Sequence, residues 1–264
     1  MRTDFRGDIQ GLRAVAVAGV VLAHAGVGAL EGGFAGVDVF FVISGFLITG
    51  QLLGALEREG RIRFGDFYAR RARRLLPAAL VVIALTAIAS LWCLAPTALP
   101  LSLRDAAAAA LYVPNLVFAA RGTDYFADDT PSLYQHFWSL GVEEQFYLAW
   151  PLLIALVAGV FVRSRAALAA FLALVVAASF AWCLVETGRH QPWAFFPVWS
   201  RAWQFAVGAA CALGLPLLGR VPAGIRAAAS WAGFAGVVAA YLAYDDATAY
   251  PGSAAVLPTL SAAL

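Results

Sequence analysis

Residues 34–53 read Phe-Ala-Gly-Val-Asp-Val-Phe-Phe-Val-Ile-Ser-Gly-Phe-Leu-Ile-Thr-Gly-Gln-Leu-Leu, and Asp38 is the one charged side chain among them. An α-helix of this length rises about 30 Å, which is the thickness of the hydrocarbon core of a bilayer. The stretch therefore predicts a transmembrane helix. A water-soluble core does not explain the composition, because 62% of the 264 residues are hydrophobic.

Six further runs of mainly apolar residues have nearly the length needed to cross a bilayer. They are 12–30, 75–95, 138–161, 166–186, 198–219 and 228–244. A last run, 254–264, is too short to span. The sequence therefore predicts an all-α protein, a polytopic transmembrane helical bundle of about seven complete spans with an eighth cut short at the C-terminus. We expect a single membrane domain, 1–264.

The distribution of arginine predicts the orientation of the bundle. The loop 54–74 holds seven of the 18 basic residues, all of which are arginine. Since cytoplasmic loops are enriched in Lys and Arg, this loop and the N-terminus are expected in the cytoplasm. If the Ala-rich segment 104–120 does not cross, 13 loop arginines lie inside and 3 outside, whereas crossing gives 11 and 5. We therefore expect 104–120 to form a re-entrant or interfacial helix.

Charge and cysteine content argue against two other kinds of site. The net charge of +2 is concentrated in a few loops, unlike the basic face of a nucleic-acid-binding protein. The cysteines Cys93, Cys183 and Cys211 lie inside apolar runs without metal-type spacing, so neither a disulfide framework nor a zinc site is expected.

Four ionisable residues stand inside predicted spans, where a charge costs several kcal/mol and is a functional candidate by default. They are Arg13, His24, Asp38 and Glu143. Arg13 and His24 are eleven residues apart, so at about 100° per residue they return to the same helix face, about 16 Å apart along the axis. We expect both side chains to face one cavity.

Asp38 enters from the neighbouring span, after a short glycine turn, at nearly the depth of His24. A carboxylate on one imidazole nitrogen fixes the tautomer and leaves the other nitrogen as a base near neutral pH. The sequence favours a His24–Asp38 pair as the acid–base element of a transfer reaction. The alternative is a buried pair that only holds two helices together.

Glu143 is a second candidate for orienting His24. Spacing of four residues places Ser139, Glu143 and Tyr147 on one face of the span that starts at Trp138. In the predicted topology Glu143 lies near the depth of His24. The aromatic residues around it are also typical of an interfacial belt.

A basic stretch, Phe67-Tyr68-Ala69-Arg70-Arg71-Ala72-Arg73-Arg74, precedes the third apolar run. Such a stretch is typical of a juxtamembrane patch that binds anionic lipid. It also has a functional interpretation, in which Arg70, Arg73 and Arg74 on one helical side bind the phosphates of a cytosolic nucleotide-like donor.

Taken in order, four blocks of this sequence resemble the acyltransferase-3 family of membrane acyltransferases, which O-acetylate lipopolysaccharide, peptidoglycan and other exported glycans. The blocks are Asp8 to Ala14 followed by His24, Gly36 to Ile48, Phe67 to Pro77, and Trp138 to Tyr147. Ser200 to Gly208 and the tail Tyr250-Pro251-Gly252 are also similar to the family, although Gln204 stands where a glutamate is common.

The resemblance implies transfer of an acyl group, usually acetyl, from cytosolic acetyl-CoA to a hydroxyl of a cell-envelope glycan, at the outer side of a bacterial plasma membrane. It makes acetyl-CoA the co-substrate, with no metal, and membrane lipid and the glycan the partners, with no nucleic acid. An extracytoplasmic domain beyond the C-terminus is a further expected partner, since some family members carry one.

The family's Arg and His separated by ten residues correspond to Arg13 and His24, and its paired arginines to Arg70 and Arg73. Donor contacts are expected from Tyr68, Arg70, Arg73 and Arg74, and acceptor contacts from Ser44, Trp138, Ser139, Tyr147 and Arg201.

Two mechanisms and two other functions stay open at this point. Either His24 deprotonates the acceptor hydroxyl as it attacks the acyl carbon, or the acyl group first rests on Ser44, Ser139 or His24. A transporter or flippase of a lipid-linked sugar would use the same buried residues for binding without reaction. A structural membrane subunit would use them for helix packing.

Overall fold

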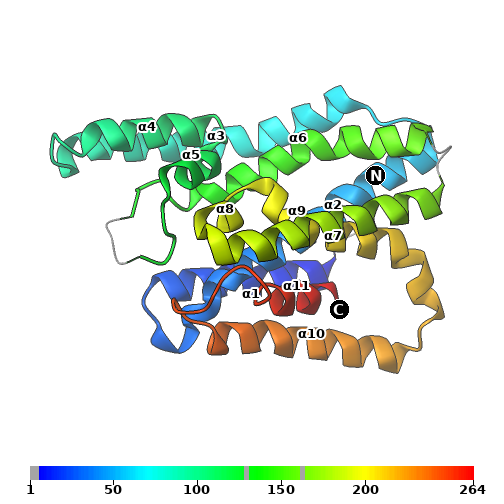
Figure 1. The fold of residues 1–264 in the computed structure, drawn as a ribbon. Coiled ribbons are helices and arrows are strands. Elements are labelled where there is room, and N and C mark those ends of the chain that lie inside the picture. Colours follow the sequence, from blue (N-terminus) through cyan, green and yellow to red (C-terminus); the bar gives the residue numbers. More distant parts are fainter. Residues whose placement is uncertain (1–5, 128–130, 161–163) are drawn as a thin grey trace.

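Helices make up all the regular structure in the part of the chain that the computed structural model describes, residues 6–127, 131–160 and 164–264. No strand occurs among these residues, which confirms the predicted all-α class. The long helices lie side by side along one axis (Figure 1). They are α1 (Gly7–His24), α2 (Gly36–Glu59), α3 (Phe64–Cys93), α6 (Phe137–Val160), α7 (Arg165–Arg189), α9 (Val198–Gly214) and α10 (Ala223–Ala243). The shorter ones are η1 (Gly28–Ala35), α4 (Leu99–Ala110), α5 (Pro114–Arg121), α8 (Gln191–Phe195), η2 (Leu215–Arg220) and α11 (Val256–Ala263).

Six of the described helical segments are long and apolar enough to cross a membrane, against seven expected from the sequence. They are Gly28–Glu59, Phe64–Cys93, Phe137–Val160, Arg165–Arg189, Gln191–Arg220 and Ala223–Ala243. The difference is α1, which has 18 residues and carries Asp8, Gln10 and Arg13 in its first half. The last helix, α11, has 8 residues and is too short to span, as expected.

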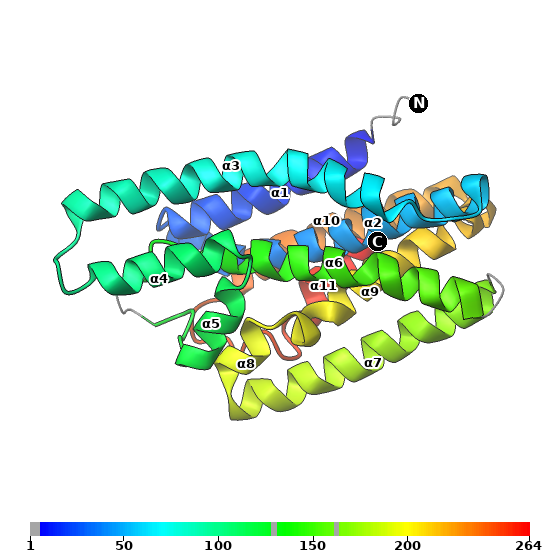
Figure 2. The same cartoon turned by 90° about the horizontal axis from the view of Figure 1, so that it is seen from above.

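The segment 104–120 does not form one continuous helix. The chain breaks between α4 and α5 at Tyr112, whose φ of 57° lies in the left-handed region, and Pro114 then opens α5. With 12 and 8 residues, neither helix is long enough to cross a bilayer, which agrees with the re-entrant or interfacial prediction. Figure 2 shows that α3 and α4 extend beyond the other helices at the end of the bundle away from the N-terminus.

Asp105 ties α4 to its neighbours. This buried carboxylate lies 2.6 Å from the Arg121 guanidinium at the end of α5 and accepts a 2.6 Å hydrogen bond from the Ser132 hydroxyl. The three residues come from α4, α5 and the segment that leads into α6. The short helices are therefore fixed to the bundle by a paired charge as well as by apolar packing.

Glycines let the helices α2 and α9 touch through their backbones. A methyl group on Gly45 would collide with the Phe205 carbonyl, and one on Gly208 would collide with the Val42 carbonyl. Small residues at such crossings are typical of helix pairs in membranes, where association depends on close packing. Helix α2 is therefore held directly against α9, and Gly36 similarly meets the Ala16 carbonyl of α1.

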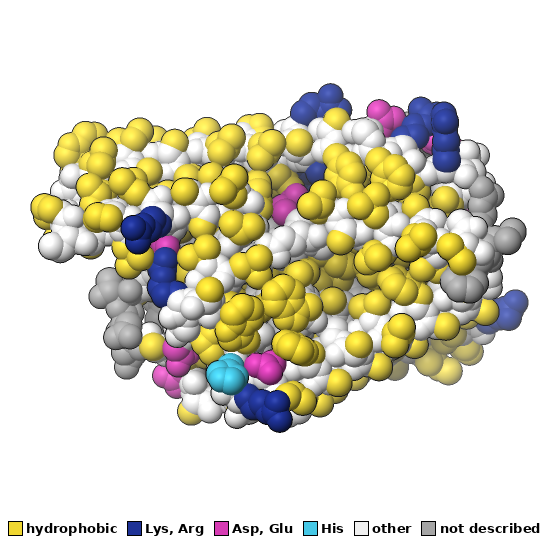
Figure 3. All heavy atoms as spheres, turned by 45° about the horizontal axis from the view of Figure 1, so that its top comes forward, with side chains coloured by type: hydrophobic (Ala, Val, Ile, Leu, Met, Phe, Trp, Pro, Cys, Tyr) yellow, Lys and Arg dark blue, Asp and Glu magenta, His cyan; other side chains and the backbone are white. Residues whose placement is uncertain are grey.

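Apolar side chains cover most of the bundle surface between its two ends. On the face shown in Figure 3, hydrophobic side chains cover most of the surface and the arginines lie in separate groups, mainly around its margin. Large apolar residues such as Leu85, Leu148 and Trp231 are more than half exposed, as expected for contact with lipid. We name the two ends for their residues: the arginine-rich end, where α2 ends and α3 begins, and the His24 end, where α1 ends and α2 begins.

Candidate active site

Arg13 and His24 lie on one uninterrupted helix, so the face predicted from their spacing is preserved. His24 is the last residue of α1 and its side chain is exposed. Arg13 is partly buried and forms no ion pair with another residue in the described part of the chain. The two groups thus stand along the same side of α1, one within the bundle and one at its end.

Both nitrogens of the His24 ring have hydrogen-bond partners. Nδ1 lies 2.8 Å from the Val20 carbonyl oxygen, one turn back in α1. Nε2 lies 3.2 Å from the hydroxyl of Tyr125, which belongs to the loop after α5. The orientation of the ring is therefore set by its own helix on one side and by a distant loop on the other.

Asp38 does not pair with His24, and the expected His24–Asp38 pair is wrong. The Asp38 carboxylate lies 3.0 Å from the Arg201 guanidinium and also accepts hydrogen bonds from the Gln204 side chain and the Tyr250 hydroxyl. Gly36 faces α1, and two further residues turn the helix by about 200°, so Asp38 points away from α1 toward α9. The carboxylate joins α2, α9 and the segment before α11.

Arg201 is sealed in the same network and faces protein on all sides. Its side chain is 1% exposed, and its Nε donates a 2.8 Å hydrogen bond to the Phe195 carbonyl. Its guanidinium carbon lies 4.9 Å from the ring centre of Phe195 and 5.6 Å from those of Trp138 and Tyr250. In this structure Arg201 contacts these aromatic rings and Asp38, and it has no open side for the acceptor contact expected of it.

Glu143 forms the centre of a second polar cluster, between α2 and α6. Its carboxylate accepts a hydrogen bond from Ser44 and a 2.8 Å bond from the Tyr147 hydroxyl one turn along α6. The predicted face of Glu143 and Tyr147 is confirmed by this bond. Ser139, the third residue of that face, is partly buried one turn toward the His24 end.

Glu143 does not lie at the depth of His24. Gly36 of α2 packs against Ala16 of α1. His24 is eight residues beyond Ala16 in one direction, and Ser44 is eight residues beyond Gly36 in the other, which amounts to about 24 Å of helix rise. The predicted shared depth is therefore wrong, because Glu143 bonds to α2 about two turns deeper than Asp38. Along the bundle axis, Arg13 lies between the depths of His24 and Ser44, because it precedes Ala16 by three residues in α1.

Arg71 is the arginine of the basic stretch that turns into the bundle. Its guanidinium carbon lies 3.2 Å from the centre of the Tyr147 ring, and its Nη2 lies 3.4 Å from the Glu144 carboxylate. Its Nε is buried without a hydrogen-bond partner in the described residues. Sequence reasoning assigned no role to Arg71, because four arginines within five residues offer no local sign of which one faces inward.

The other arginines of the stretch point outward. Arg70, Arg73 and Arg74 are exposed at the arginine-rich end and form no ion pair within the described residues. Tyr68 lies beside them, and its hydroxyl donates a 2.8 Å hydrogen bond to the Leu148 carbonyl of α6. These three side chains are free for an anionic partner, whereas Tyr68 fastens α3 to α6.

Aromatic rings pack behind Tyr125, whose hydroxyl is the hydrogen-bond partner of His24. Trp138, expected as an acceptor contact, is 2% exposed. Its ring centre lies 4.7 Å from that of Phe195 and 6.0 Å from that of Tyr125. Trp138 therefore supports Tyr125 from inside the bundle.

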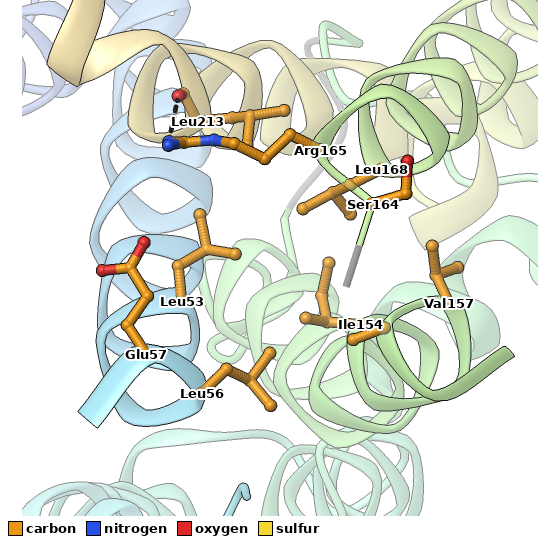
Figure 4. A pocket seen from close by; sticks show the side chains of 10 residues that line it. Leu53, Leu56, Glu57, Ile154, Val157, Ser164, Arg165, Leu168 and Leu213 are labelled. Carbon is orange, nitrogen blue, oxygen red and sulfur yellow. Dashed lines mark hydrogen bonds between the residues drawn. The ribbon is translucent and has the colours of Figure 1, made fainter. Parts of the chain in front are cut away.

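Two cavities open near the arginine-rich end. One, of about 220 Å³, lies between α2, α6, α7 and α9, where Glu57 and Arg165 face mainly leucine and valine side chains (Figure 4). Arg165 donates a 3.1 Å hydrogen bond to the Leu213 carbonyl there. The other, of about 480 Å³, runs along α1 from Arg6 to Val15. Neither is lined by Arg13, His24 or Glu143.

Comparison with known proteins identifies the family of the chain. A family model described as an acyltransferase domain matches residues 6–264, which is nearly the whole chain. The chain belongs to the acyltransferase-3 family. No solved structure matches it.

Two bacterial relatives of this acyltransferase-3 chain have names that state an activity. The chain is 39% identical over 215 residues to a protein of Bacillus subtilis (strain 168) with the provisional name peptidoglycan O-acetyltransferase YrhL, covering 79% of this chain and 33% of that protein. It is 42% identical over 146 residues to O-acetyltransferase OatA of Staphylococcus aureus (strain NCTC 8325 / PS 47), covering 55% of this chain and 24% of that protein. The chain thus spans a third or less of the length of these relatives.

Proposed function

We propose that this membrane acyltransferase-3 chain transfers an acetyl group from acetyl-CoA to a hydroxyl of a cell-envelope glycan, with His24 as the base. The observation that carries the proposal is the His24 ring at the end of α1, with Arg13 on the same helix face. The Val20 carbonyl accepts from Nδ1 and leaves Nε2 with the lone pair. The names of the relatives support acetyl as the group and peptidoglycan as the glycan.

The orientation follows the arginines. We place the arginine-rich end in the cytoplasm of a bacterial cell, because cytoplasmic loops are enriched in arginine. The N-terminus is then cytoplasmic, and His24 faces the outer side of the plasma membrane. The donor and the acceptor thus meet the bundle at opposite ends.

The donor phosphates bind to Arg70, Arg73 and Arg74 in this proposal. Their exposure and lack of ion pairs leave the guanidinium groups available, and guanidinium matches phosphate geometry with two parallel hydrogen bonds. From there the extended arm of the donor runs inward past Arg13 toward His24. In this proposal Glu143 and Arg71, which contact Ser44 of α2 and Tyr147 of α6, line that path.

The chemical step needs a base at the acceptor. The acceptor oxygen attacks the thioester carbonyl carbon, its proton passes to His24 Nε2, and the carbon–sulfur bond breaks to release the thiolate of CoA. The buried Asp38–Arg201 pair stands apart from this step. We assign it the role of holding α2, α9 and the segment before α11 together around the site.

The test uses purified protein in detergent with acetyl-CoA and peptidoglycan fragments. His24→Ala is expected to lower transfer about 100- to 10,000-fold, which is the usual contribution of a general base. The matched control is His190→Ala, because His190 is exposed at the end of α7, where its ring lies 3.5 Å from Glu186. Both variants are compared at equal yields of folded protein.

Two results would contradict the proposal. No acetyl-CoA-dependent transfer by well-folded wild-type protein would favour a transporter of a lipid-linked sugar, and movement of such a sugar across proteoliposomes would then be measured. Equal losses of acetyl transfer in His24→Ala and His190→Ala would show that His24 has no special role.

A further inference from the structure

The hydrogen bonds of His24 specify its tautomer. A backbone carbonyl can only accept, so the 2.8 Å contact with Val20 requires a proton on Nδ1. In the neutral ring Nε2 then carries the lone pair. The Tyr125 hydroxyl, 3.2 Å away, must therefore be the donor in its bond to Nε2.

Tyr125 is held rigidly in this position by aromatic neighbours. Its ring stacks on Phe195, with centres 4.5 Å apart and planes 23° apart. The ring edges of Phe126 and Trp138 meet it at centre distances of 5.2 and 6.0 Å. The hydroxyl is thus the polar tip of a packed aromatic side chain, and moving it away from His24 would break several ring contacts.

Burial keeps this hydroxyl protonated. Removal of the ring from water raises the pKa of Tyr125 to about 12, against smaller opposing effects of Trp138 and Arg201. At neutral pH the hydroxyl therefore keeps its proton and can donate it. The group on Nε2 is a neutral O–H whose oxygen interacts with the Trp138 side chain and has a further lone pair for an acceptor hydroxyl.

The lone pair of His24 Nε2 thus already accepts a hydrogen bond from the Tyr125 hydroxyl, which the ring contacts of Tyr125 hold in place. An acceptor hydroxyl has two ways to reach Nε2: it displaces Tyr125, or it bonds to the Tyr125 oxygen and uses the bond already present. The fixed aromatic surroundings favour the second way. The oxygen of a phenol accepts a hydrogen bond while it donates another.

We propose that Tyr125 is a proton relay between the acceptor hydroxyl and His24 Nε2. This inference rests on the proposed function and adds a catalytic residue to it. The acceptor O–H proton moves to the Tyr125 oxygen as the Tyr125 proton moves to Nε2. The acceptor oxygen bonds to the acyl carbon, the carbon–sulfur bond breaks, and the imidazolium proton ends on the CoA thiolate. Tyr125 and His24 both return to their starting states.

The first test is Tyr125→Phe, which keeps the ring and removes the hydroxyl. A relay predicts a fall in kcat of about 100-fold or more, in the range of a lost general base, with the KM for acetyl-CoA unchanged. In a His24→Ala background Tyr125→Phe adds no further loss, because the two residues act as a unit. The control is Tyr134→Phe, whose hydroxyl bonds to the Ile83 carbonyl in a separate cluster.

The second test does not depend on activity. The chain has 3 histidines, so ¹⁵N-histidine labelling gives three imidazole signal sets, assigned with His136→Gln and His190→Gln. His24 is expected with a protonated Nδ1 and a hydrogen-bonded, unprotonated Nε2. Tyr125→Phe should move the Nε2 resonance to higher frequency, toward that of a free pyridine-type nitrogen.

The outcomes separate the two proposals. An Nε2–H tautomer, an Nε2 resonance unmoved by Tyr125→Phe, or a kcat that is unchanged or higher in Tyr125→Phe would overturn the relay. If wild type is active, His24→Ala is not and Tyr125→Phe is fully active, only the relay fails. If wild type transfers no acetyl group, the proposed function fails and the relay with it.

Discussion

The Asp38 carboxylate and the Arg201 guanidinium lie 3.0 Å apart with side chains that are 2% and 1% exposed. They are separated by 163 residues in sequence, and they connect the beginning of α2 to the beginning of α9. A charge pair in such a place is costly to break from one side, because the remaining charge stays buried without a partner. The pair therefore controls whether the bundle holds together near the site.

Asp38→Ala is expected to destabilise the protein by about 3–5 kcal/mol, because it leaves the Arg201 charge uncompensated. The measurement is the apparent Tm of the purified protein in detergent, with the exposed Asp246→Ala as control. The double variant Asp38→Leu with Arg201→Met should regain much of the loss. A double variant as unstable as the sum of the two single ones would contradict this account.

Close packing of α2 on α9 predicts strong sensitivity at their glycines. Gly208→Ala should lower the yield of folded protein and the apparent Tm, because the new methyl group meets the Val42 carbonyl. Gly50→Ala is the control, because Gly50 lies in α2 and a methyl group added there has no neighbour within 4 Å. Gly50→Ala is expected to be neutral or to stabilise by roughly 0.5–1 kcal/mol. Similar Tm losses in both variants would argue against the close approach.

Donor binding at the exposed arginines predicts a salt-dependent KM. Arg73→Ala and Arg74→Ala should each raise the KM for acetyl-CoA roughly fivefold, since an exposed ion pair contributes up to about 1 kcal/mol. The effect should shrink as salt rises, because screening weakens the wild-type contact. Arg226→Ala, also exposed, is the control. A KM for acetyl-CoA that is unchanged in both variants would favour the interpretation of the stretch as a site for membrane lipid.

His136, in the segment before α6, reports on the charge of His24. Burial and, to a smaller extent, the positive charge of protonated His24 lower the pKa of His136 below its ordinary value. Its neutral form is therefore favoured in the folded protein, and its contribution to stability is lost as pH falls through the ordinary histidine range. An NMR titration should show His136 protonating below the ordinary histidine range, and His24→Gln should raise the His136 pKa. A fall or no change in that variant would contradict the coupling.

Local sequence pattern predicted the features that depend on one helix. The Arg13–His24 face needs only an unbroken α1, and the Glu143–Tyr147 contact needs only one turn of α6. These predictions use helix geometry alone, and they hold.

Features that depend on how helices are rotated against each other were missed. Helix α2 is apolar on nearly every side, so its sequence does not say that Gly36 faces α1 and Asp38 faces α9. The depth of Glu143 depends on how far α6 is shifted along the bundle axis relative to α2. Runs of apolar residues do not specify this shift. Tyr125 belongs to a loop without periodicity, and its part in the site follows from a contact with a residue 101 positions away.

The glycine contacts between α2 and α9 also divide the bundle into stationary and movable parts. Backbones that touch at Gly45 and Gly208 cannot slide without collisions, so these two helices form a fixed wall. Helix α1 carries Arg13 and His24 on the other side of α2 and ends in an exposed residue. When substrates enter and products leave, we expect α2, α9 and the part of α1 that Gly36 contacts to stay in place, so that movement is left to segments outside this core.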